Sequence, residues 1–95
     1  MNVSEQRLEL ARIVELSDLM LSAAKNEEWE AVVAIHKFRD PLIHVFFAQH
    51  VVINQQELSE FIRSTIVQDA EVAILGKQER NQLQVQLKKV VQGKS

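Results

Sequence analysis

Two histidines and an aspartate at four-residue intervals are the side chains whose types and spacing best suit chemistry. His36, Asp40 and His44 would share one strip of a helix, because residues four apart lie on the same face. Imidazole and carboxylate groups are ligands that zinc accepts. Pro41 interrupts the strip and the sequence offers no fourth ligand nearby, so the pattern favours a plain polar strip. We expect no metal and no other cofactor.

Two charged residues fall on faces that are otherwise apolar. Arg39 lies within the apolar arc of one predicted helix, and Asp69 lies near the middle of the apolar face of another. Charges in such positions are seldom buried without a partner. We therefore predict an ion pair between Arg39 and Asp69 that fixes the register of the two helices. The alternative is that one or both reach solvent at a rim.

The residues show little that suits catalysis. Absence of cysteine removes thiolate chemistry, and two glycines cannot make a glycine-rich phosphate loop. A small all-helical enzyme of chorismate mutase type would need arginines that converge on a dicarboxylate. The first predicted helix lacks the Arg-x-x-Ile-Asp pattern of such enzymes, so we predict that the protein is not an enzyme. The arginines available for such a site are Arg7, Arg12, Arg39, Arg63 and Arg80.

Composition indicates one soluble helical domain over residues 1–95. Apolar residues make up 46% of the chain, and glycine and proline together occur only three times, which argues against an all-β chain. Eleven basic against thirteen acidic residues predict no nucleic-acid partner. No apolar run approaches the roughly 20 residues of a membrane span, and the N-terminus does not resemble a signal peptide. We expect a cytoplasmic protein that does not insert into membranes.

Helical periodicity predicts an all-α fold, an antiparallel three-helix bundle with a long last helix. The second helix is apolar nearly all round, so it is the predicted central helix. Ser4 is the expected N-cap of the first helix, Asn26 would end that helix or cap the next, and Asn54 with Glu57 has the spacing of a capping box. The expected helices are 4–25, 27–50 with a kink near Pro41, and 55–92, the last one bent at Gly76 or split there into a fourth.

The long last helix predicts where a partner binds. A helix of that length would outrun its neighbours, so its far end should protrude, fray or meet a partner. Four apolar residues lie off its main stripe and indicate a surface for a partner helix. They are Val67, Ile74, Leu75 and Val85.

Several stretches together resemble FliT-type flagellar export chaperones. NEEWEAV and the run from Ile35 to Asp40 resemble the second helix of that family. Ile66-x-x-Asp69-x-x-Val72, Arg80-x-x-Leu83-x-x-x-Leu87 and the closing Gly93-Lys94 resemble its long third helix. Family members often continue beyond this Gly-Lys, whereas this sequence ends there, and Pro41 interrupts a helix that is expected to be regular.

The resemblance implies a small cytoplasmic bundle that binds the C-terminal region of the filament-cap protein before type III export. Contacts with the export apparatus are implied in the same way. A structural or oligomerising bundle without an export role is the alternative, and a homodimer stays open.

Overall fold

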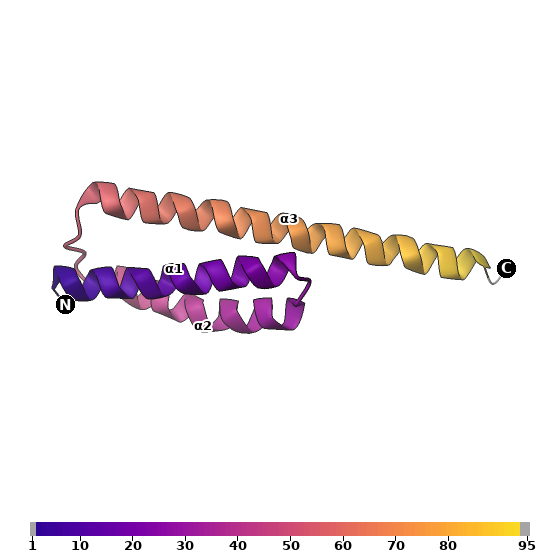
Figure 1. Cartoon of the computed structure of the whole chain (residues 1–95), viewed down its shortest axis with the longest axis horizontal. Coiled ribbons are helices and arrows are strands. Elements are labelled where there is room, and N and C mark those ends of the chain that lie inside the picture. The colour runs from indigo at the N-terminus through magenta and orange to yellow at the C-terminus, as the bar shows by residue number, and fades with distance from the viewer. Residues whose placement is uncertain (1, 94–95) are drawn as a thin grey trace.

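A computed structural model describes residues 2–93, and Lys94 of the predicted Gly-Lys ending lies outside that range. The described residues form three helices, α1 (Val3–Lys25), α2 (Trp29–Ala48) and α3 (Gln55–Gly93), with no strand among them. Figure 1 shows α1 and α2 as an antiparallel hairpin, with α3 lying along it and running far past its end. The predicted all-α fold with a long last helix is therefore confirmed.

The first helix, α1, is the one that packs on both others. The backbones of α2 and α3 stay apart along their described lengths. Side chains bridge them, as in the contact of Arg39 with Asp69. The prediction that the second helix is central is therefore wrong. Its apolar circumference is wider than α1 and α3 can cover, and Phe38 and Val45 are left 64% and 63% exposed.

Two apolar clusters hold the bundle, with a polar layer between them. The cluster nearer the α2–α3 connection contains Leu10, Ile13, Phe46, Ile53 and Phe61. The cluster nearer the α1–α2 turn contains Met20, Ala23, Ala24 and Val32. Ser17 of α1 and Arg39 of α2 are buried between these clusters, and Arg39 reaches Asp69 of α3.

The start of α1 and the α1–α2 turn differ from expectation in one residue each. Asn2, not Ser4, is the N-cap: its side chain accepts a hydrogen bond of 2.9 Å from the backbone N–H of Glu5. Asn26 is the C-cap of α1, but the left-handed residue is Glu27, with φ of 60°. The N–H groups of Glu27 and Glu28 bond the carbonyls of Ala24 and Ala23, which is a Schellman motif.

Replacing Glu27 by glycine is expected to raise the free energy of unfolding by about 1 kcal/mol, because a side chain in the left-handed region is strained and glycine is not. Urea unfolding followed by circular dichroism measures the change. Glu28→Gly is the matched control: Glu28 has φ of −90°, so glycine there should lower stability slightly. Equal shifts for the two variants would contradict this account.

Pro41 and Gly76 do not break their helices. α2 continues through Pro41, and α3 continues through Gly76, so the alternative of a fourth helix is excluded (Figure 1). A Cβ atom at position 76 would lie 3.8 Å from the ring of Trp29, which is ordinary contact. Residues 80–92, which we call the overhang, are all exposed and extend past the hairpin. The predicted protrusion of the last helix is confirmed.

The connection between α2 and α3 is held by a buried glutamine of α1. Gln6 donates from Nε2 to the carbonyl of His50, and its Oε1 accepts from the N–H of Val52, each at 2.8 Å. Ile53 of the same connection is buried in the core. Asn54 then caps α3 by accepting from the N–H of Glu57 at 2.8 Å, as predicted. The connection is thereby fixed by both backbone and side-chain contacts.

Candidate functional site

A groove lies between α2 and α3, where the two backbones stay apart. Its hollow has a volume of about 320 Å³. The floor is Met20 of α1, and most of the lining atoms are apolar. The lining side chains from the other two helices are Val32, Val33, His36 and Lys37 of α2 and Asp69, Val72 and Ala73 of α3. Val33 is 52% exposed, so apolar surface in this groove is open to solvent.

The structure brings Arg39 and Asp69 together beside this groove. Arg39 is 2% exposed and donates to both carboxylate oxygens of Asp69, at 2.7 and 2.9 Å. It also donates to Ser17 Oγ at 3.1 Å and to Asp40 Oδ1 at 3.2 Å. One guanidinium therefore joins side chains of all three helices. Its hydrogen bond to Asp69 raises the pKa of Arg39 against the lowering effect of burial, so the group stays charged.

A second charged contact joins α1 to the start of α3. Arg7 donates to the two carboxylate oxygens of Glu57, at 3.1 and 2.8 Å. These hydrogen bonds hold the pKa of the Glu57 carboxyl below its ordinary value. Asn54 Nδ2 also donates to Glu57 at 3.2 Å, so this contact replaces the glutamate-to-backbone bond of a full capping box.

The strip of His36, Asp40 and His44 is only partly drawn together. His36 Nε2 lies 3.1 Å from Asp40 Oδ2 in an exposed i,i+4 contact. No group of three or more side chains of metal-binding type is close enough to hold an ion within residues 2–93. Asp40 instead links His36 to Arg39, which extends the polar network along the rim of the groove.

The predicted partner-binding residues do not line the groove. Val67, Ile74 and Val85 are each more than half exposed, and their spacing places them on one face of α3. Leu75 is different, because it is half-buried against the core cluster that contains Met20. Sequence reasoning missed Val33, Val72 and Ala73 as groove residues because it placed α2 at the centre of the bundle, where no open side would remain.

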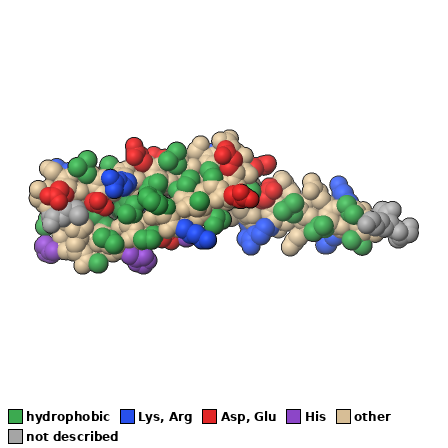
Figure 2. All heavy atoms as spheres, turned by 90° about the horizontal axis from the view of Figure 1, so that it is seen from below, with side chains coloured by type: hydrophobic (Ala, Val, Ile, Leu, Met, Phe, Trp, Pro, Cys, Tyr) green, Lys and Arg blue, Asp and Glu red, His purple; other side chains and the backbone are tan. Residues whose placement is uncertain are grey.

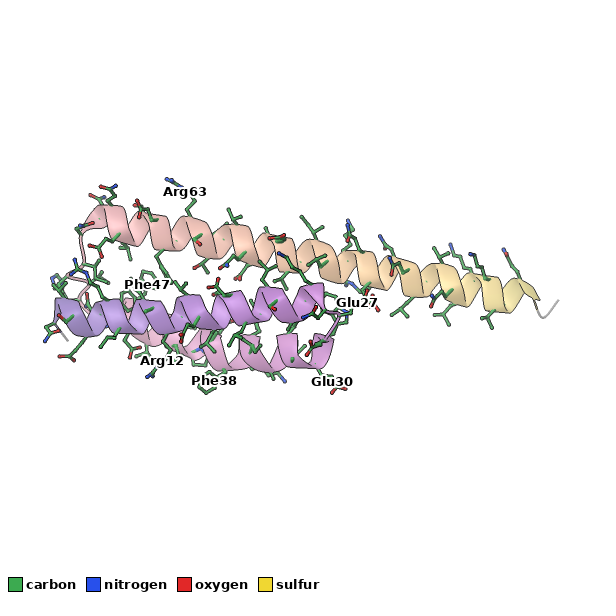
Figure 3. The ribbon with its side chains drawn as sticks, viewed as in Figure 1. Arg12, Glu27, Glu30, Phe38, Phe47 and Arg63 are labelled. Atoms are coloured by element: carbon green, nitrogen blue, oxygen red, sulfur yellow. The ribbon has the colours of Figure 1, made fainter. Side chains whose placement is uncertain are left out.

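A second exposed apolar strip follows the outer side of α2. Ala34, Phe38, Pro41 and Val45 are all exposed and recur at intervals of four and three residues, so they share one helical face. Figure 3 shows Phe38 pointing away from the body, and Figure 2 shows hydrophobic side chains gathered over the body on that side. These are the residues that make the second helix apolar nearly all round.

The arginines do not converge on a common site. Arg7 is paired with Glu57 and Arg39 with Asp69. Figure 3 shows Arg12 and Arg63 on opposite sides of the molecule. Arg80 lies at the start of the overhang. A dicarboxylate site of the chorismate mutase kind would need several of these groups together, so their placement does not fit such a site.

Comparison with known proteins gives one match. The family described as "Flagellar protein FliT" matches residues 8–95, which is nearly the whole chain. No curated protein and no solved structure matches the sequence. Among the described residues, none of the helices has the length and apolar character needed to cross a membrane.

Proposed function

The chain belongs to the FliT family of flagellar proteins, and on this basis we propose that it is a cytoplasmic export chaperone. In this proposal it binds the C-terminal region of the filament-cap protein as an amphipathic helix and delivers it to the type III export apparatus. The observation that carries the proposal is the open apolar groove between α2 and α3, with Met20 as its floor.

The walls of the groove suit a helix better than a small molecule. They are two helices whose backbones stay apart, so an incoming helix can lie between them and make side-chain contact with each. Its apolar face would cover Val33, Val72 and Ala73, which together line the hollow. Burying this surface shields the partner's own apolar segment from aggregation before export.

Charged side chains at the rim of the groove would set the orientation of the partner helix. His36 and Lys37 lie on the α2 wall and Asp69 on the α3 wall. A partner helix can pair with these charged groups through polar residues on either side of its apolar face. It then binds in one register, because any other register leaves charges unpaired at the interface. The groove is short and partly polar, which favours modest affinity and therefore release to the export apparatus.

Calorimetric titration with a peptide from the C-terminal region of the candidate cap protein tests this site. Saturable binding with a negative heat-capacity change is expected for burial of apolar surface. Val33→Glu should weaken binding at least about tenfold, which corresponds to about 1.4 kcal/mol, because it places a charge in the groove. Val67→Glu makes the same change on the outer face of α3 and should leave affinity within about twofold of the wild type.

Each contrary result has a distinct meaning. If Val67→Glu weakens binding and Val33→Glu does not, the partner uses the outer face formed by Val67, Ile74 and Val85. If a folded protein gives no heat with the peptide, the proposed cap-protein partner is wrong. A structural bundle with another partner then becomes the better interpretation.

A further inference from the structure

The face of α3 that lines the groove continues toward the start of that helix. Asp69 and Ala73 line the groove, and Ile62 and Ile66 precede Asp69 by seven and three residues. Residues at these intervals share one helical face. Ile62 and Ile66 are 40% and 63% exposed and belong to neither core cluster. The groove-facing side of α3 therefore carries a further stretch of exposed apolar surface.

The groove-facing side of α2 continues in the same way. Val33 and His36 line the groove, and Phe47 follows them by 14 and 11 residues, which is close to four and three full helical turns. Phe47 is 42% exposed, and its ring centre lies 6.5 Å from that of Phe61 in α3. Figure 3 shows Phe47 between the hairpin and α3. We call the exposed apolar surface formed by Phe47, Ile62 and Ile66 the distal patch.

Charged side chains separate the groove from the distal patch, and most of them are already paired. Arg39 donates to both carboxylate oxygens of Asp69. The two carboxylate oxygens of Asp40 lie against Arg39 and His36. Lys37 also lines the groove, but within residues 2–93 it makes no ion pair. Lys37 is therefore the charge in this region that a partner can neutralise.

We propose that the groove and the distal patch together hold one amphipathic helix, which carries two apolar clusters and a carboxylate between them. The carboxylate faces Lys37, because an interface favours opposite charges in register. The proposal rests on the proposed function, in which a partner helix lies in the groove, and adds the pattern by which that helix is recognised. A helix with one unbroken apolar face fits less well, because it would desolvate the charges around Arg39 and Asp69 without pairing them.

The spacing of the two surfaces sets the length of the partner helix. Val33 and Phe47 are 14 residues apart in α2, and Ile62 and Ala73 are 11 residues apart in α3. At 1.5 Å per residue these separations are about 21 Å and about 17 Å. The two apolar clusters of the partner must therefore be centred about three to four helical turns apart, in a helix of at least about 18 residues. A shorter helix reaches the groove alone and gains nothing from the distal patch.

Two synthetic peptides test the pattern by fluorescence anisotropy. One forms an amphipathic helix with two leucine clusters about three to four turns apart and a glutamate between them. The other has glutamine in place of the leucines of one cluster. The two-cluster peptide should bind the wild-type chain at least about tenfold more tightly, because its second contact forms within a complex that the first has already made. Equal affinities of the two peptides would overturn the proposal.

A pair of neighbouring residues on α3 tests the distal patch itself. Ile66→Glu should weaken binding of the two-cluster peptide at least about tenfold, because it places a charge against an apolar cluster. It should leave the one-cluster peptide within about twofold of its affinity for the wild type. Val67→Glu is the matched control, since Val67 is 61% exposed but lies on another face. Equal effects of the two variants on the two-cluster peptide would exclude the distal patch. Circular dichroism checks that both variants are folded.

A charge exchange tests the contact with Lys37. Lys37→Glu should weaken binding of the two-cluster peptide about tenfold, and lysine in place of the peptide's central glutamate should restore it. Lys89→Glu makes the same change on the overhang, away from the groove, and should have little effect. If the exchanged peptide does not recover affinity for Lys37→Glu, the partner's carboxylate does not face this residue.

These outcomes are distinct from failure of the proposed function, because the synthetic peptides are not taken from a cap protein. If they bind as described and the cap-protein peptide does not bind, the recognition pattern stands and the cap-protein partner is wrong. If the cap-protein peptide binds and Ile66→Glu does not weaken it, the groove acts alone and the proposal of a second apolar contact is wrong. If no peptide binds the folded chain, both proposals are wrong.

Discussion

Replacing Asp69 by alanine is expected to lower the free energy of unfolding by about 3 kcal/mol. The substitution leaves the guanidinium of Arg39 charged and 2% exposed, without the two oxygens that accept its shortest hydrogen bonds. Loss of one partner of a buried ion pair costs about 3–5 kcal/mol. The lower end applies because the side chain of Asp69 is 40% exposed and water can reach the vacated position. Urea unfolding of the two proteins measures the difference.

Two further variants separate the contribution of the ion pair to stability from the general effect of removing a charge. Glu71→Ala removes an exposed acidic side chain from the same helix and should change stability by less than about 0.5 kcal/mol. The double variant Arg39→Met/Asp69→Leu should recover most of the loss, because apolar side chains of similar size replace both charges. If Asp69→Ala is as mild as Glu71→Ala, the contact does not contribute to stability.

The position of the ion pair was predictable because both partners interrupt apolar faces. A charge on such a face demands a partner, and Arg39 and Asp69 were the two charges placed this way. The hydrogen bonds from Arg39 to Ser17 and Asp40 were not predictable. Which neighbours a guanidinium reaches depends on how the helices are rotated against one another, and helical phase alone does not give that rotation.

The main error of the prediction from sequence was the order of the helices in space, with α2 placed at the centre. The groove between α2 and α3 was missed for the same reason. The sequence indicates how much of each helix is apolar, and α2 is the most apolar. It does not indicate whether that surface is covered within one chain or left exposed, and Phe38 and Val45 are exposed. The wide apolar circumference of α2 therefore indicated surface that is left exposed, and not a central position. The open side between α2 and α3 follows from α1 lying at the centre.

The polar layer and the groove are connected. Arg39 and Asp69 bridge α2 and α3 at a point where their backbones stay apart, and Asp69 also lines the groove. The pair therefore holds the two walls at a fixed separation while leaving the surface beside it open. An all-apolar replacement would let the walls close more tightly. The Arg39→Met/Asp69→Leu variant should therefore bind the proposed partner peptide more weakly than the wild-type chain does, even though it recovers most of the free energy of unfolding.

Replacing Gln6 by methionine is expected to lower the free energy of unfolding by about 2 kcal/mol. Gln6 is 0% exposed, and its amide satisfies both the carbonyl of His50 and the N–H of Val52 in the α2–α3 connection. Methionine has a similar length but offers neither bond. A buried polar group left without a partner costs about 1–3 kcal/mol, and the lower end applies to each group here because both hydrogen bonds are part-buried and His50 and Val52 are exposed. Urea unfolding measures the loss, and Gln84→Met, at an exposed position of α3, should have little effect.

The Gln6→Met substitution should loosen the α2–α3 connection more than it loosens the rest of the fold. Hydrogen exchange at the Val52 amide should become faster in Gln6→Met than exchange at amides within α1, because the direct acceptor of that N–H is gone. Ile53 should still anchor the connection in the core, so the chain keeps its fold. Unchanged exchange at Val52 would mean that burial of the connection, and not the glutamine, protects this amide. In that case the hydrogen bonds of Gln6 would not be what protects the α2–α3 connection, which lies more than forty residues away in the sequence.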